Sequence, residues 1–132
     1  MDVNHTHPLV AIVDQQADVR NHLTDLIQTL NYDVRAFVDA KSLLGELGRL
    51  DFACVILEMY LPDETGMSVL KRMKQHEPAI PVIMLSSDSE VPDAVKAMQA
   101  GCVDFVEKPF VDRVMVQKIQ RAVNCFYGDS CC

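Results

Sequence analysis

Four short apolar runs of the sequence each lead to a side chain that could take part in phosphate chemistry. These side chains are Asp14, Glu58, Ser86 and Lys108. A carboxylate can attack phosphorus or hold a divalent cation, whereas an amine and a hydroxyl can bind phosphoryl oxygens. If the four runs form neighbouring strands, these residues can build an acyl-phosphate site.

The apolar runs alternate with longer amphipathic stretches, which predicts repeating strand–helix units. Strands are predicted over residues 9–14, 32–37, 52–58, 81–86 and 103–107. Helices are predicted over residues 17–30, 39–47, 66–76, 91–101 and 111–127. Apolar strands of this kind indicate a parallel sheet covered by helices on both faces, which is an α/β fold. In such sheets the working site lies beyond the carboxyl ends of the strands, where the four side chains would meet.

The length of 132 residues indicates a single domain. We expect its core over about residues 8–126 and a disordered tail over residues 127–132. The first ten residues, MDVNHTHPLV, lack a basic flank and a long apolar stretch, so no signal peptide is predicted. No apolar run approaches the ~20 residues of a membrane span, and we expect no membrane partner.

The net charge of −7 argues against a nucleic-acid surface on this domain, because phosphate binding needs an excess of Lys and Arg. The five cysteines form no C-x-x-C pair and have no histidine at zinc-ligand spacing. Their odd number and the missing signal peptide favour a cytoplasmic location. Cys54 and Cys102 are predicted to be buried thiols, and a redox role for Cys131 and Cys132 is a minor alternative.

Four blocks of the sequence carry a resemblance to a known family: VAIVDQQADVR, VILEMYLPDETGMSVL, PVIMLSSDSE and AMQAGCVDFVEKPF. Over residues 8–126 the chain resembles the receiver domain of response regulators in two-component signalling. The resemblance implies a flavodoxin-like (βα)5 fold with a five-stranded parallel sheet in the order 2-1-3-4-5. It also implies a signalling module and not an enzyme. Residues 65–101 are similar to receivers that precede a helix-turn-helix domain, so DNA would be contacted only through a separate effector domain.

The resemblance implies a role for each of the chemically competent positions. Lys108 is the expected phosphate-contacting lysine, Ser86 the switch hydroxyl and Phe105 the switch aromatic residue. The strand that in the family ends in the phospho-accepting aspartate ends here in Glu58. The chain is therefore expected to be an atypical receiver with an altered acceptor position.

The magnesium site implied by the resemblance is altered as well. Its ligands would be Asp14, Glu58 and the backbone carbonyl of Tyr60. Gln15 stands where a second acid is expected and offers only a neutral carbonyl oxygen. Because Mg²⁺ depends on carboxylates and loses water reluctantly, we expect at most a weak Mg²⁺ site.

Glu58 is one methylene longer than aspartate, which adds about 1.5 Å of reach. A misplacement of ~1 Å can cost on the order of 100-fold in rate, so the geometry for phosphoryl transfer is impaired. The same reach brings the carboxylate toward Lys108 and Ser86, where it would partly imitate the phosphorylated state. A solvated strand-end carboxylate without a role is the alternative.

Three functions remain open. The first is a phosphorylation-independent interaction module whose partner is another protein or a second copy of the chain. It would bind through residues 91–100, residues 111–126 and the strand between them. The exposed candidates there are Lys96, Gln99, Asp112 and Arg113. The second function is a phosphorylatable response regulator that takes phosphate from a histidine kinase. The third is a small-ligand module on the same fold, disfavoured because no glycine-rich phosphate loop follows the first strand.

Overall fold

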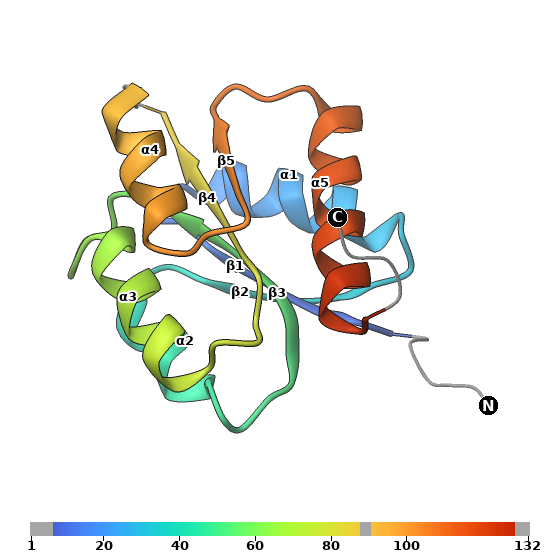
Figure 1. Ribbon diagram of the computed structural model, residues 1–132. Coiled ribbons are helices and arrows are strands. Elements are labelled where there is room, and N and C mark those ends of the chain that lie inside the picture. The colour runs from blue at the N-terminus through green and yellow to red at the C-terminus, as the bar shows by residue number, and fades with distance from the viewer. Residues whose placement is uncertain (1–6, 88–90, 129–132) are drawn as a thin grey trace.

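The computed structural model describes residues 7–87 and 91–128, which form one parallel sheet between two layers of helices (Figure 1). The strand order is β2-β1-β3-β4-β5. The strands are β1 (Leu9–Val13), β2 (Asp33–Phe37), β3 (Phe52–Glu58), β4 (Val82–Ser86) and β5 (Asp104–Glu107). The α/β class and the strand order predicted from the sequence are confirmed.

The helices are α1 (Ala17–Gln28), α2 (Ala40–Glu46), α3 (Gly66–His76), α4 (Val91–Gln99) and α5 (Asp112–Phe126). Helices α1 and α5 cover one face of the sheet, and α2, α3 and α4 cover the other (Figure 1). Neighbouring residues of β3 pack into the buried clusters on opposite faces of the sheet, because side chains alternate along a strand. Ile56 belongs to the buried cluster with Leu23 of α1, whereas Leu57 belongs to the cluster with Leu70 of α3.

Local polar contacts explain where several helices begin and end. The Asp39 carboxylate accepts a hydrogen bond from the Ser42 amide at 2.9 Å and caps α2. The Thr65 hydroxyl accepts one from the Ser68 amide at 3.2 Å and caps α3. Gly101 follows α4 with a φ of 110°, which favours glycine and stops the helix.

Most element boundaries differ from the predicted ones by one or two residues, and two differences concern the site and the C-terminal segment. Strand β1 ends at Val13, so Asp14 lies just beyond it, although the Asp14 amide still donates to the Phe37 carbonyl at 3.1 Å. Tyr127, assigned above to a disordered tail, is partly buried and packs edge-on against Phe126 at a centroid distance of 5.1 Å. Its aromatic ring packs against the α1–α5 core, which leaves Tyr127 partly buried. The remainder of that tail, residues 129–132, lies outside the described residues.

Cys54 and Cys102 are buried, as predicted. Burial raises the pKa of Cys54 to about 12 and that of Cys102 to about 11, so both thiols stay protonated at neutral pH. Cys131 and Cys132 lie outside the described residues. Within the described ranges, the helices are too short or too polar to span a membrane.

The start of α3 lies directly against the end of β3. A Cβ atom at Gly66 would stand 2.2 Å from the backbone oxygen of Glu58, so only glycine fits without a backbone shift. The Gly66 amide also donates to the Met59 carbonyl at 2.7 Å. These contacts fix the strand end that carries Glu58 relative to α3.

We expect Gly66→Ala to lower the free energy of unfolding by about 2 kcal/mol or more, because the added methyl group overpacks a backbone contact. Gly45→Ala is the matched control, since a Cβ there meets nothing within 4 Å. It should be neutral or stabilise by up to about 1 kcal/mol through helix propensity. Urea denaturation followed by circular dichroism measures both variants. Equal free energies of unfolding of Gly66→Ala and Gly45→Ala would show that the close contact between α3 and β3 tolerates a Cβ atom.

Candidate functional site

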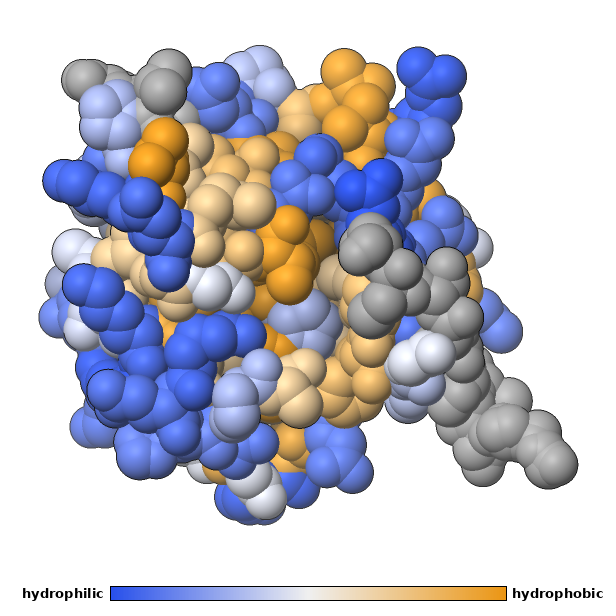
Figure 2. Space-filling model, viewed as in Figure 1, coloured by the Kyte–Doolittle hydropathy of each residue, from blue (hydrophilic) through white to orange (hydrophobic). Residues whose placement is uncertain are grey.

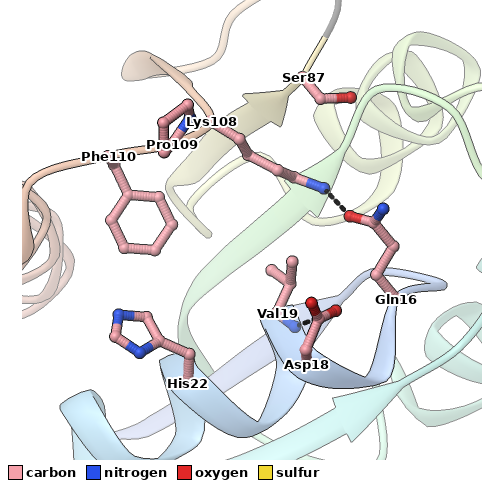
Figure 3. Close-up of a pocket in the computed structure, with 8 residues that line it drawn as sticks. All are labelled: Gln16, Asp18, Val19, His22, Ser87, Lys108, Pro109 and Phe110. Carbon is pink, nitrogen blue, oxygen red and sulfur yellow. Dashed lines mark hydrogen bonds between the residues drawn. The ribbon is translucent and has the colours of Figure 1, made fainter.

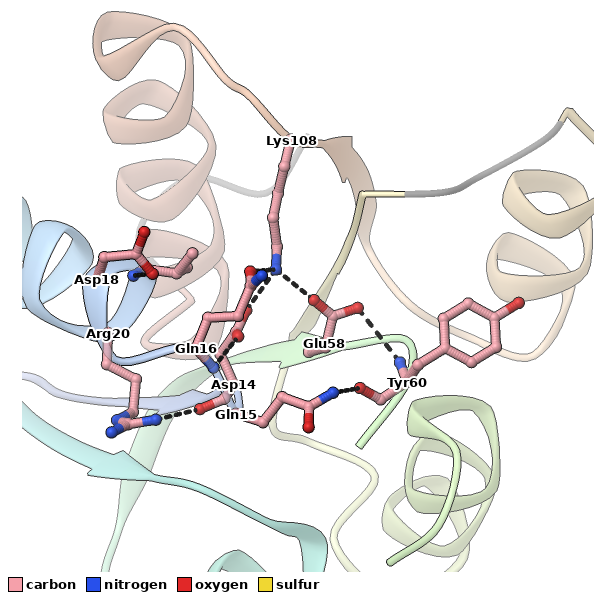
Figure 4. A network of polar contacts seen from close by, with 9 residues as sticks. Asp14, Gln15, Gln16, Asp18, Arg20, Glu58, Tyr60 and Lys108 are labelled. Atoms are coloured by element: carbon pink, nitrogen blue, oxygen red, sulfur yellow. Dashed lines mark hydrogen bonds and ion pairs between the residues drawn. The ribbon is translucent and has the colours of Figure 1, made fainter. Parts of the chain in front are cut away.

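The four chemically competent side chains meet at the carboxyl edge of the sheet (Figure 4 shows Asp14, Glu58 and Lys108). Asp14 follows β1, Glu58 ends β3, Ser86 ends β4 and Lys108 follows β5. Because β1 pairs with β3, β3 with β4 and β4 with β5, the sheet brings these ends together. Asp14, Glu58 and Ser86 are buried polar residues. The fold thus brings together the four side chains singled out in the sequence, and their functional roles stay predictions.

Lys108 is the central residue of this site. Its Nζ lies 2.8 Å from Asp14 Oδ2 and 3.0 Å from Gln16 Oε1, and it forms an ion pair with Glu58 Oε1. An ammonium group has three N–H donors and here faces three acceptors, although the contact with Asp14 Oδ2 is an ion pair without hydrogen-bond geometry. The Lys108 side chain is 10% exposed and that of Asp14 is 0% exposed, which places the interaction largely out of water.

The protonation of Lys108 reflects two opposing effects. Burial by itself lowers the pKa of Lys108, because a charged amine is poorly solvated inside the protein. The hydrogen bonds and negative charges of Asp14 and Glu58 outweigh burial, and the pKa is raised above its ordinary value of 10.5. The lysine therefore carries a firmly held positive charge at neutral pH.

Gln15 behaves differently from the expectation that it would offer a carbonyl oxygen. Its Nε2 donates a hydrogen bond to the Tyr60 carbonyl oxygen at 3.3 Å (Figure 4). The correction has a simple cause: a carbonyl oxygen facing another carbonyl oxygen would be repelled, so the amide nitrogen turns toward it. Gln15 thereby joins the β1–α1 connection to the β3–α3 connection.

The second oxygen of Glu58 is also engaged. Oε2 accepts a hydrogen bond from the Tyr60 amide at 3.2 Å, while Oε1 faces Lys108. The predicted contact between Glu58 and Lys108 is therefore present. A hydrogen bond between Glu58 and Ser86 stays a prediction.

Asp14 is held by contacts with the residue before α1 and with an α1 side chain. Its Oδ1 accepts from the Gln16 amide at 2.8 Å, and its main-chain oxygen accepts from Nη1 of Arg20, also at 2.8 Å. With Oδ1 held in this way, Oδ2 points toward Lys108. The position of the carboxylate thus follows from the turn that leads into α1.

The β3–α3 connection has a further anchor in Asp63. Its two carboxylate oxygens accept hydrogen bonds from the Ala40 and Lys41 amides, each at 3.0 Å. The Ala40 amide, followed by that of Lys41, lowers the pKa of Asp63. The first turn of α2 is therefore tied to the same loop that carries Tyr60.

The contacts described above do not fit a bound divalent cation. Both carboxylates that could hold Mg²⁺ face the Lys108 ammonium, and Gln15 presents an N–H group to the Tyr60 carbonyl. Among the described residues, no group of three or more His, Cys, Asp or Glu side chains could hold a metal ion. A cation here would have to displace Lys108 and turn the Gln15 amide.

Ser86 and Phe105 occupy the positions implied by the resemblance. Ser86 is fully buried at the end of β4, and its carbonyl accepts a hydrogen bond from the Lys108 amide at 2.8 Å. Phe105 in β5 is partly buried and packs against the core beneath α2, α3 and α4. Their switch roles stay predictions.

Gln16 is a site residue that the sequence analysis missed. Its side-chain oxygen contacts Lys108, although 92 positions separate the two residues. The only sequence signal was its place two residues after Asp14 in the DQQ segment. Nothing in the pattern indicated which way this side chain would turn.

Residues 10–120 match the family described as the response regulator receiver domain. The chain belongs to this family. The receiver domain is 35% identical over 115 residues to the transcriptional regulatory protein FixJ of Bradyrhizobium diazoefficiens, covering 87% of this chain and 56% of FixJ. It is 31% identical over 122 residues to the response regulator protein TmoT of Ectopseudomonas mendocina, covering 92% of this chain and 56% of TmoT. The chain thus spans about half the length of these relatives.

Solved receiver domains share the fold. A signal receiver domain of an HD domain-containing protein from Pseudomonas fluorescens Pf-5 superposes with a TM-score of 0.90 at 24% identity, covering 98% of this chain and 96% of that one. The beryllofluoride-activated DrrB receiver domain superposes with a TM-score of 0.82 at 25% identity, covering 89% and 98%. Receiver domains are signalling modules of two-component response regulators, and this defines the class of function.

We expect Lys108→Ala to lower the free energy of unfolding by about 3–5 kcal/mol at pH 7, because it leaves two buried carboxylates without their cation. Lys96→Ala removes an exposed lysine and should have almost no effect. The raised pKa of Lys108 means that its contribution is complete below pH 10.5 and is lost as the pH rises through the higher folded-state pKa. Denaturant titrations between pH 7 and strongly alkaline pH should show the free energies of unfolding of the wild type and of Lys108→Ala becoming equal. A difference that is small at pH 7 would contradict a charged, buried Lys108.

Proposed function

We propose that this receiver domain signals mainly without phosphorylation, with Glu58 holding part of the arrangement that a phosphoryl group would create. The contact between Glu58 Oε1 and Lys108 Nζ carries this proposal. The lysine that would bind an incoming phosphoryl oxygen already has three protein acceptors. Phosphate would have to compete with buried carboxylates for it.

The length of Glu58 explains how this contact forms. By the family pattern an aspartate stands at the acceptor position, and glutamate reaches about 1.5 Å further. Its carboxylate supplies one negative charge, whereas a phosphoryl group supplies ≈1.5 to 2. Glu58 is therefore a partial substitute, and the active arrangement it favours is also partial.

Gln15 also supports signalling without phosphorylation, because it weakens the Mg²⁺ site that phosphoryl transfer needs. Phosphoryl transfer in the family uses Mg²⁺, and here Gln15 replaces one acid while its amide hydrogen-bonds to the Tyr60 carbonyl. A weak Mg²⁺ site made by Asp14, Glu58 and Tyr60 would form only after Lys108 moves. The site as it stands is stabilised by its own charges.

The alternative is a phosphorylatable response regulator that receives phosphate from a histidine kinase on Glu58. Family membership and the similarity to FixJ and TmoT favour this alternative. It requires that Lys108 leave Glu58 and that Mg²⁺ enter. Phosphate transfer that is lost in Glu58→Gln would support it.

We further propose that the output surface is the α4-β5-α5 face. Figure 2 shows apolar side chains between and over these elements. The large exposed hydrophobic residues on α4, in the connection to β5 and on α5 are Val95, Met98, Val103 and Val114. The exposed polar candidates Lys96, Gln99, Asp112 and Arg113 lie on the same helices, and all are exposed as predicted. An apolar patch with a polar rim is typical of a protein-binding surface.

The occupant of this face is a second copy of the chain or another protein domain. FixJ is a transcriptional regulatory protein about twice the matched length, so a DNA-binding effector outside these residues is one such domain. The net charge of −7 keeps direct DNA binding by the receiver unfavourable. We expect the domain to act in the cytoplasm.

The phosphorylation-independent proposal predicts a gain of function. The double variant Gln15→Asp, Glu58→Asp should recover Mg²⁺-dependent phosphorylation by acetyl phosphate, with the wild type slower by about 100-fold or more. Intact-mass spectrometry measures the phosphoryl adduct, and Glu58→Gln is the non-acceptor control. Ready phosphorylation of the wild type at Glu58 would refute the proposal, and an inert double variant would show that other residues disable the site.

The surface proposal predicts that Met98→Asp weakens self-association by about tenfold or more, because it places a charge in an apolar contact. Met98 is 49% exposed, and Val38, away from this face and 46% exposed, supplies the control Val38→Asp. Sedimentation equilibrium of the wild type and both variants measures the dimerisation constants. Equal effects of the two substitutions, or a wild type that stays monomeric, would contradict dimerisation through this face.

A further inference from the structure

A pocket of about 440 Å³ lies beside the Lys108 site, between the start of α1 and the connection from β5 to α5 (Figure 3). Its lining residues are Gln16, Asp18, Val19, His22, Ser87, Lys108, Pro109 and Phe110. The volume falls in the range of ≈300–1,000 Å³ that small-molecule sites occupy. This pocket is not the phosphoryl site, although Lys108 and Gln16 border both.

One side of the pocket is apolar. The rings of His22 and Phe110 lie 5.7 Å apart with a 42° tilt, so they form a continuous wall (Figure 3). Val19 and Pro109 extend this wall. His22 contacts Asp112, with Nε2 2.7 Å from Oδ1, and this contact orients the ring. Such a wall suits a flat apolar group.

The other side of the pocket is polar, and the charges at Lys108 and behind it sum to a negative value. Lys108 already contacts Asp14, Glu58 and Gln16, so its charge is engaged within the protein. The charges of Asp14, Glu58 and Lys108 sum to about minus one, and Asp18 at the rim adds another negative charge. A ligand with a positive group therefore meets complementary charge here.

An anionic ligand is less suited to this pocket, even though α1 starts here and helix N-termini attract anions. Two amides at the start of α1, that of Gln16 just before the helix and that of Val19 in its first turn, already have partners within the protein. Asp14 Oδ1 accepts from the Gln16 amide, and Asp18 Oδ1 accepts from the Val19 amide at 3.0 Å. The carboxylates of Asp14 and Asp18 thus occupy two amide positions at this helix start, and their negative charge disfavours a phosphate or carboxylate.

We propose that this pocket binds a small organic cation, made of a flat aromatic body and an amine. The aromatic body would lie along Phe110, His22 and Val19, and the amine would face Asp18. The side-chain Nε2 of Gln16 supplies a donor for any acceptor on the ligand. The inference goes beyond the proposed function, since such binding requires neither phosphorylation nor its absence at Glu58.

The pocket is also connected to the Lys108 site. Gln16 lines the pocket, and its Oε1 accepts a hydrogen bond from Lys108 Nζ at 3.0 Å. A ligand that displaces the Gln16 side chain therefore changes the contacts of Lys108. A bound cation would thereby alter the Glu58–Lys108 pair without touching Glu58. This gives the receiver an input for a chemical signal.

Tryptamine is a suitable probe, with indoleacetate as a partner of the same ring and opposite charge. In nuclear magnetic resonance titrations of the ¹⁵N-labelled chain, tryptamine should give saturable shifts at residues 16–22 and 108–112. For a fragment of this size we expect a dissociation constant in the millimolar range. Indoleacetate should bind at least about tenfold more weakly than tryptamine, because its carboxylate is repelled by the carboxylate of Asp18.

Two variants locate the binding. Phe110→Ala removes the aromatic wall and should weaken tryptamine binding about tenfold. Asp18→Asn should reduce the preference for tryptamine over indoleacetate, whereas Asp25→Asn removes an exposed carboxylate from the same helix outside the pocket and should not. Because Asp18 is exposed, Asp18→Asn keeps the test decisive even if Phe110→Ala unfolds the chain.

Absent binding of tryptamine, equal binding of both probes, or equal effects of Asp18→Asn and Asp25→Asn would overturn the proposal. Shifts centred on α4 and β5 would overturn it as well. None of these results depends on phosphorylation of Glu58, so a failure here is distinct from a failure of the proposed function. Shifts at Glu58 on addition of tryptamine would in addition support the connection to the Lys108 site.

Discussion

The buried ammonium of Lys108, placed between the carboxylates of Asp14 and Glu58, constrains the whole carboxyl edge of the sheet. These three residues come from the ends of β1, β3 and β5, which only a correctly ordered sheet brings together. An isolated charge at this depth would be costly, and the three charges offset one another at close range. Any phosphoryl group or metal ion that enters must therefore replace interactions that the chain already makes.

The surrounding loops hold Glu58 in place for this contact. Gly66 lets α3 approach the Glu58 backbone, and Asp63 ties the following loop to the start of α2. Gln15 joins the same loop to the β1–α1 connection through the Tyr60 carbonyl. The β3–α3 loop is thus attached on several sides, and the position of Glu58 is set by the fold and not only by its own ion pair.

The sequence predicted the fold well, because apolar periodicity and turn residues determine which segments become strands and helices. The ranges predicted for β3 and α3 agree with the structure, and the approach of Glu58 to Lys108 followed from parallel strands ending at one edge. Side-chain orientation was less accessible. The roles of the Gln15 nitrogen and of Gln16 depend on contacts between residues far apart in the chain, which no local pattern encodes. The pocket beside Phe110 was missed for the same reason.

The central claim is that Lys108 stays with Glu58 when Mg²⁺ is present. Nuclear magnetic resonance of the wild-type chain, with labels on the Lys108 ammonium and the Glu58 carboxylate, tests it directly during titration with Mg²⁺ and then beryllofluoride. We expect both signals to remain almost unchanged, because both carboxylates already face the Lys108 ammonium. Release of Lys108 from Glu58 by Mg²⁺, followed by tight beryllofluoride binding, would contradict the account.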